Sequence, residues 1–121
     1  MLRKTLLTCA LFMCSATVFA ETAPLSVSYQ GTYLKVRDNV TFPVWQLTVT
    51  SLDNDITIES LTLNRDNCLI SINGRGKNMS KRLKYGQTFS FTTPSNRGFT
   101  QCRPLELTVG TNKGPFTFNW S

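Results

Sequence analysis

Side chains that could do chemistry are few in this sequence, and the most informative type is missing. The chain contains no histidine, which is the usual general base near neutral pH and the commonest metal ligand. A Ser-His-Asp or Cys-His arrangement is therefore excluded. The paired carboxylates of Asp53 and Asp55 share one short turn, which lacks the glycine and distal glutamate of a calcium loop. We expect a solvated hairpin there, no metal, no cofactor and no enzymatic activity.

A basic segment between residues 73 and 85 is the most distinctive polar feature. Within ten residues it carries five cations, Arg75, Lys77, Lys81, Arg82 and Lys84, followed by Tyr85. These charges would attract an acidic protein surface, lipopolysaccharide phosphates or another polyanion. We interpret the segment as a candidate partner-binding loop, with a solubilising surface loop as the alternative. Nucleic acid is not expected, since the aromatic residues alternate along strands and form no stacking platform.

The end of the chain alternates aromatic and polar residues, with Phe116, Phe118 and Trp120 on one side. This segment resembles the terminal strand of chaperone-usher pilin subunits, which pairs through alternating apolar side chains and a penultimate aromatic residue. The resemblance covers about eight residues and implies an assembly strand. Pilin domains are usually longer and carry their disulfide earlier. The alternative interpretation is an ordinary last strand whose aromatic side chains fill the core.

The start of the chain has the pattern of an export signal. Arg3 and Lys4 precede an apolar run from Leu6 to Val18, and a small residue, Ala20, stands at the expected cleavage point. The run is shorter than the roughly 20 residues that a membrane-spanning helix needs. We predict a cleavable signal at residues 1–20, one domain at residues 21–121, and a periplasmic or secreted protein. Losing two basic residues lowers the formal net charge from +6 to +4.

Cleavage also changes the cysteine count. Cys9 and Cys14 would leave with the signal, and Cys68 and Cys102 would remain. An even pair in an oxidising compartment predicts one disulfide, with two free buried thiols as the alternative. Closing a loop of about 34 residues would stabilise the fold by roughly 3–4 kcal/mol. A lipoprotein signal acylated at Cys9 or Cys14 is a rival interpretation, but the residues before them fit that site poorly.

The elements that must position these groups are predicted to be strands. Apolar and polar residues alternate after position 25, and no stretch keeps a helical period beyond two turns. A change of phase at Glu59 and Ser60 predicts a bulge. Trp45 is expected in the core. Strands are predicted at residues 25–29, 33–36, 44–50, 56–63, 68–72, 88–92, 105–109 and 116–120, with turn residues between them.

Seven or eight short strands without a helical crossover predict an all-β protein, an antiparallel two-sheet sandwich of immunoglobulin or fibronectin III type. A closed barrel is the alternative. The signal, mature size and strand pattern together resemble small secreted enterobacterial proteins with a fibronectin III-like sandwich, the interleukin receptor mimic-like proteins. That resemblance implies a secreted binding module that contacts host cytokines, dimeric by strand exchange.

We therefore expect a non-enzymatic, exported protein-binding module that recognises a protein or envelope partner through loops such as residues 73–85. One alternative is a pilin-like assembly subunit that uses its last strand. Another is a secreted inhibitor of a hydrolase, which would use a protruding loop as a plug. Deleting residues 116–121 would abolish assembly in the first alternative, whereas neutralising the basic loop would remove binding in the primary hypothesis.

Overall fold

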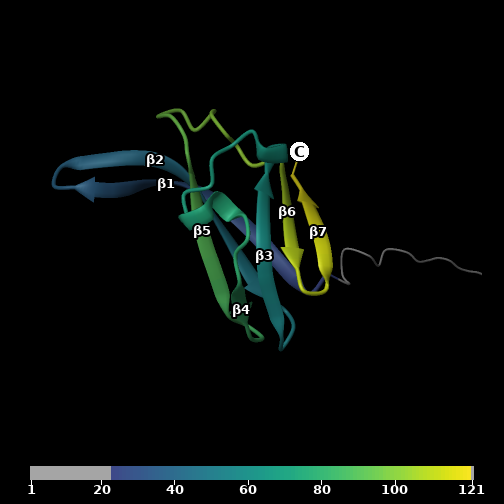
Figure 1. Ribbon diagram of the computed structural model, residues 1–121. Coiled ribbons are helices and arrows are strands. Elements are labelled where there is room, and N and C mark those ends of the chain that lie inside the picture. The colour runs from purple at the N-terminus through teal and green to yellow at the C-terminus, as the bar shows by residue number, and fades with distance from the viewer. Residues whose placement is uncertain (1–22, 121) are drawn as a thin grey trace, which may run out of the picture.

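Two antiparallel sheets packed face to face make up the computed structural model, which describes residues 23–120 (Figure 1). The signal predicted at residues 1–20, with Cys9 and Cys14, lies outside the described residues. The strands are β1 (Leu25–Arg37), β2 (Val40–Ser51), β3 (Ile56–Leu63), β4 (Lys81–Leu83), β5 (Thr88–Pro94), β6 (Glu106–Thr111) and β7 (Gly114–Asn119). One sheet has the order β1-β2-β5 and the other β4-β3-β6-β7. The predicted fold class, an all-β sandwich of immunoglobulin or fibronectin III type, is confirmed.

The core lies between the sheets and follows the alternation of the sequence. Trp45, Leu47 and Val49 project from β2 and are almost completely buried, because successive strand residues face opposite sides. The prediction that Trp45 is a core residue is confirmed. The facing sheet contributes buried aliphatic side chains from β3 and β6: Ile56, Ile58, Leu61, Leu63, Leu107 and Val109.

The predicted bulge in β3 is also confirmed. The pairing of β3 with β6 shifts register between Ile58 and Ser60. Two residues on the bulged strand then oppose one on its partner, so the side-chain alternation resumes in the opposite phase. Both Ile58 and Leu61 are fully buried as a result.

Two details of the strand prediction were wrong, the break within residues 25–36 and the strand at residues 68–72. Residues 25–29 and 33–36 belong to one strand, β1, which continues through Gln30 to Thr32 in unbroken register with β2. Residues 68–72 form a loop, in which the Ile72 N–H turns back to the Ile70 carbonyl at 3.0 Å instead of joining a ladder. Ile70 is still buried, which accounts for the apolar pattern. The three-residue strand β4 was not predicted.

Cross-links fix the loops at one end of the sandwich. The predicted disulfide between Cys68 and Cys102 is present, with 5.8 Å between the Cα atoms. Beside it, Asn64 Oδ1 accepts hydrogen bonds from the backbone N–H groups of Leu105 (2.9 Å) and Glu106 (3.0 Å). The Asn64 side-chain amide donates to the Arg103 carbonyl. These bonds hold the segment before β6 against the end of β3.

Candidate functional site

A β-hairpin that extends beyond the sandwich is the most prominent feature of the surface. β2 pairs with β5 only from Val44 to Thr50, so the described residues provide no third strand and no facing sheet for the part of the hairpin nearer its turn. We call residues 31–43 the arm. Figure 1 shows the arm projecting from the body of the sandwich, with the ends of β1 and β2 standing apart from the other strands.

Large apolar side chains concentrate on this arm. Nine large hydrophobic residues are exposed in the described part of the chain, and five of them belong to the arm: Tyr33, Leu34, Val36, Val40 and Phe42. Their side chains are between 43% and 56% exposed. Single exposed apolar residues are ordinary, whereas a cluster of them on one projecting element is typical of an interaction surface.

The register assigns the arm residues to its two faces. Leu34 lies directly opposite Phe42 on the outer face of the sheet, where the sandwich itself carries polar pairs such as Gln30 and Gln46, bonded at 3.2 Å. Tyr33 lies opposite Pro43 on the inner face. The outer face therefore changes from polar to apolar where it leaves the sandwich.

The base of the arm is fixed by aromatic packing. The ring of Phe99 lies against Gly31 and makes edge-to-face contacts with Tyr33 and Trp45, at centroid distances of 5.4 and 5.6 Å. Such contacts are the preferred geometry of aromatic pairs. Phe99 thus joins the arm to the core and sets the direction in which the arm leaves the sandwich.

The same row of rings continues to Trp120, the residue that follows β7. Tyr29 makes edge-to-face contacts with Trp45 and with Trp120, at 5.5 and 5.2 Å. The guanidinium carbon of Arg103 lies 5.6 Å from the centre of the Trp45 ring, within cation–π range. The indole Nε1 of Trp45 is buried without a hydrogen-bond partner among the described residues.

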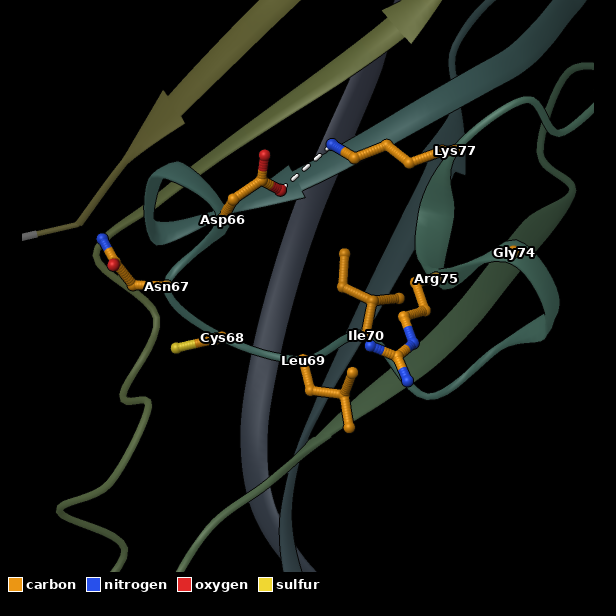
Figure 2. A pocket seen from close by; sticks show the side chains of 8 residues that line it. All are labelled: Asp66, Asn67, Cys68, Leu69, Ile70, Gly74, Arg75 and Lys77. Carbon is orange, nitrogen blue, oxygen red and sulfur yellow. Dashed lines mark hydrogen bonds and ion pairs between the residues drawn. The ribbon is translucent and has the colours of Figure 1, made fainter.

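The structure divides the predicted basic loop into two groups. Arg75 and Lys77 lie beside a groove of about 460 Å³, whereas Lys81 and Arg82 are on β4 and Lys84 and Tyr85 follow it. Figure 2 shows the Arg75 guanidinium beside Ile70 and Leu69, and Lys77 reaching to Asp66. The groove has one wall from the loop after β3 and one from the segment around Gly74.

Two of the five cations already have anionic neighbours. Lys77 Nζ lies 3.0 Å from Asp66 Oδ1 and also donates to the Thr62 hydroxyl. Arg82 Nε lies 3.0 Å from Asp55 Oδ1. These are exposed pairs and contribute little to stability, but they reduce the positive field that the loop presents.

The predicted assembly strand is β7, and it is paired in its own chain. It forms a continuous antiparallel ladder with β6, from Thr111 opposite Gly114 to Glu106 opposite Asn119. The side chains of Phe116 and Phe118, and that of Trp120 just after the strand, pack partly buried against the core.

The paired carboxylates at residues 53 and 55 face cations of the same chain. Lys113 Nζ donates to Asp53 Oδ2 at 2.7 Å, and the Asp55 N–H donates to Asp53 Oδ1 at 3.0 Å. These hydrogen bonds lower the pKa of Asp53 from its ordinary value. Asp55 is the partner of Arg82. Each carboxylate is therefore held by a basic side chain on the surface.

The arm was not identified as a site from the sequence. Its apolar residues fit strand alternation, and nothing in the pattern shows that β5 stops at Pro94. The one available signal is the segment from Tyr33 to Arg37. In a strand, Tyr33 falls on one face together with Lys35 and Arg37, and the apolar Leu34 and Val36 fall on the other face.

Comparisons of the chain with protein-family models, curated proteins and solved structures found no match. Among the described residues no helix is long and apolar enough to cross a membrane.

Proposed function

We propose that this protein is an exported, non-enzymatic binding module, and that the arm is its principal contact surface for a partner protein. The observation that carries the proposal is the concentration of five exposed large apolar side chains on one projecting hairpin. Burying such side chains in an interface is favourable by about 25 cal/mol per Å² of apolar area. Aromatic residues such as Tyr33 and Phe42 are enriched at the centres of protein interfaces.

The geometry of the arm supports this function over a general surface role. Phe99 packs on Gly31 and Tyr33, so the arm is held before a partner arrives. A pre-organised element loses less conformational entropy on binding than a mobile loop. In this proposal the basic loop has a secondary role, since Lys77 and Arg82 already have acidic neighbours. The protein is periplasmic or secreted, in keeping with its disulfide.

Inhibition of a hydrolase is the second candidate function. It requires a protruding element that enters a cleft, and the arm is such an element. It differs from the first in its partner: an enzyme would lose activity when the arm binds. The assembly alternative requires β7 to leave β6, with which it pairs along its whole length.

Site-specific photo-crosslinking in the natural host tests the proposal. A photoreactive residue is placed at position 34 or 42 on the arm, at position 46 on the polar outer face, and at position 75 in the basic loop. We expect adducts with one partner protein from the two arm positions and none from position 46. Adducts from position 75 alone, with protein or lipopolysaccharide, would overturn the assignment to the arm.

The oligomeric state is measured on the same samples. The resemblance to the secreted fibronectin III-like proteins implies a homodimer formed by strand exchange. Such a dimer would give adducts between two copies and twice the monomer mass in sedimentation. If a dimer dissociates when residues 116–121 are deleted, the assembly alternative replaces the arm proposal.

A further inference from the structure

The described residues form four edge strands, and three of these strands carry features that hinder pairing with another chain. Unpaired edge strands present rows of free N–H and C=O groups, and proteins commonly protect them with short strands, charges or proline. β4 is only three residues long and begins with Lys81 and Arg82. β5 ends at Pro94, and the Ser71 N–H donates to its Thr92 carbonyl at 2.9 Å.

The last strand is protected by the position of its proline. The Trp120 N–H donates to the Leu105 carbonyl at 2.9 Å. In steps of two back along the strand, the backbone N–H and C=O groups of Phe118, Phe116 and Gly114 therefore also point toward β6. The backbone groups of Pro115, Thr117 and Asn119 point away from β6. Pro115 has no N–H to offer there, which removes one donor from the short outward edge of β7.

β1 lacks these features along most of its length: it has thirteen residues and no proline, and its two cations, Lys35 and Arg37, lie only at its turn end. The Leu52 N–H donates to the Pro24 carbonyl at 2.7 Å, and Ser51 sends its own N–H to the Gln87 carbonyl on the far side of β2. The N–H and C=O groups of Leu25, which lies opposite Ser51, therefore point away from β2, and so do those of every second residue after it. The register is unbroken to Lys35. The outward donors belong to Leu25, Val27, Tyr29, Gly31, Tyr33 and Lys35.

None of these six residues is a proline, and none of their backbone groups bonds to another described residue. The free edge of β1 thus offers six successive outward positions, twice as many as β7. Such an edge is the acceptor in β-strand addition, in which main-chain hydrogen bonds provide affinity and alternate side chains provide selectivity.

The side chains next to this edge indicate what an added strand would carry. Val27 and Tyr29 are only partly buried on the inner face, and so are Phe118 of β7 and Trp120, which follows β7. The contact between Tyr29 and Trp120 joins β1 to the residue that follows β7. A strand with apolar residues at alternate positions would cover these half-exposed rings.

The charges beside the edge are positive. β1 contains Lys35 and Arg37 and no acidic residue. Arg103 lines a hollow of about 570 Å³ together with Tyr29 and Trp120, and it forms no ion pair with a described residue. A carboxylate on the added strand would therefore lie next to an unpaired cation. The β1 strand of a second copy contains no carboxylate side chain and would not supply this interaction.

We propose that the free edge of β1 binds an extended segment of a partner protein, apolar at alternate positions and acidic where it passes Arg103 and Lys35. The segment joins the sheet as a strand next to β1. This site is distinct from the outer face of the arm, because Leu34 and Phe42 take no part in it.

A synthetic peptide tests the inference. The probe is a blocked nine-residue peptide that alternates valine with serine and has one glutamate in the valine register. One control has lysine in place of glutamate, and a second has N-methyl groups on alternate backbone nitrogens. We expect amide exchange at Val27, Tyr29, Gly31 and Tyr33 to slow at least tenfold on addition of the probe. The N–H groups that already face β2 should not change.

Variants of the protein separate the edge from the side chains. Tyr33→Pro removes an outward N–H from an exposed position and should abolish peptide binding, whereas Tyr33→Val keeps the N–H and should bind. Arg103→Gln should remove the preference for the glutamate peptide over the lysine peptide. Equal binding of the N-methylated peptide, or no slowing of exchange, would overturn the proposal. If amide exchange slows as the protein concentration rises without any peptide, the edge binds a second copy of the chain, and the proposed partner is wrong.

Discussion

The ring of Phe99 occupies the space that a side chain at position 31 would need. A Cβ added to Gly31 would lie 2.8 Å from Cδ1 of Phe99, closer than carbon atoms approach without displacement. Phe99 in turn contacts both Tyr33 in the arm and Trp45 in the core. The absence of a side chain at this one position therefore allows the aromatic row that anchors the arm.

Gly31→Ala should displace Phe99 and loosen the arm. Over-packing of this kind costs about 1–3 kcal/mol in the free energy of unfolding, and urea denaturation measures it. Gly98→Ala is the matched control, because the nearest atom to its added Cβ is Thr100 Cγ2 at 3.8 Å, an ordinary contact. If both variants have the same stability as the wild type, Phe99 does not anchor the arm.

The disulfide between Cys68 and Cys102 should supply a large share of the stability. The two cysteines are 34 residues apart, and closing such a loop removes roughly 3–4 kcal/mol of chain entropy from the unfolded state. The double variant Cys68→Ser with Cys102→Ser should show a urea midpoint lowered accordingly. An unchanged midpoint would mean that Asn64 and the buried Ile70 hold this end of the sandwich without the bridge.

The surface pair of Asp53 and Lys113 predicts a pH effect with a definite sign. The hydrogen bond from Lys113, helped by one from the Asp55 backbone, lowers the pKa of Asp53 below 3.8. A carboxyl whose pKa is lower in the folded state stabilises the fold above the unfolded value and loses that contribution as the pH falls through the folded value. The contribution of the Asp53 carboxylate to the stability of the fold is therefore lost as the pH falls below about 4.

Carbon-13 NMR titration of the Asp53 carboxyl measures this shift directly. In Lys113→Ala the pKa of Asp53 should rise toward its ordinary value, because the main hydrogen-bond donor is gone. Lys35→Ala, which removes a cation from the arm, serves as the control and should leave the titration of Asp53 unchanged. A pKa that stays low without Lys113 would assign the shift to the backbone donors.

The basic loop gives a prediction that separates two surfaces. Replacing Arg75, Lys81 and Lys84 by glutamine removes the three cations of this loop that have no acidic neighbour among the described residues. If the arm is the contact surface, partner affinity should change less than threefold, and mainly the salt dependence of the association rate should fall. A loss of binding in this variant, with the stability of the wild type, would restore the basic loop as the principal site.

Much of the fold could be predicted from the sequence, because buried strands follow a two-residue period that is local. Trp45, the phase change at Ser60 and the pairing of Cys68 with Cys102 were all predictable from residue type and spacing. The segment at residues 68–72 misled the prediction, since Ile70 is buried from a loop. The apolar periodicity of a sequence indicates which residues are buried, but a residue can be buried without belonging to a strand.

The candidate site could not be predicted, for a reason that is not local. The exposure of Leu34 and Phe42 depends on where β5 ends, and the exposed edge of β1 depends on which strand lies beside it. Both are properties of the assembled sheets. The features that did stand out in the sequence, such as the cations after Gly74, are divided by the fold between a groove and β4.

The role of the arm is measured by the affinity of a protein with a polar arm for the partner found by crosslinking. Leu34→Ser combined with Phe42→Ser removes the opposed apolar pair from the outer face. Gln30→Ser combined with Gln46→Ser removes the equivalent pair within the sandwich and is the control. We predict that the dissociation constant rises at least tenfold for the arm variant and less than twofold for the control, with both folded. Equal affinity of the arm variant and the wild type would show that the arm is not the contact surface for this partner.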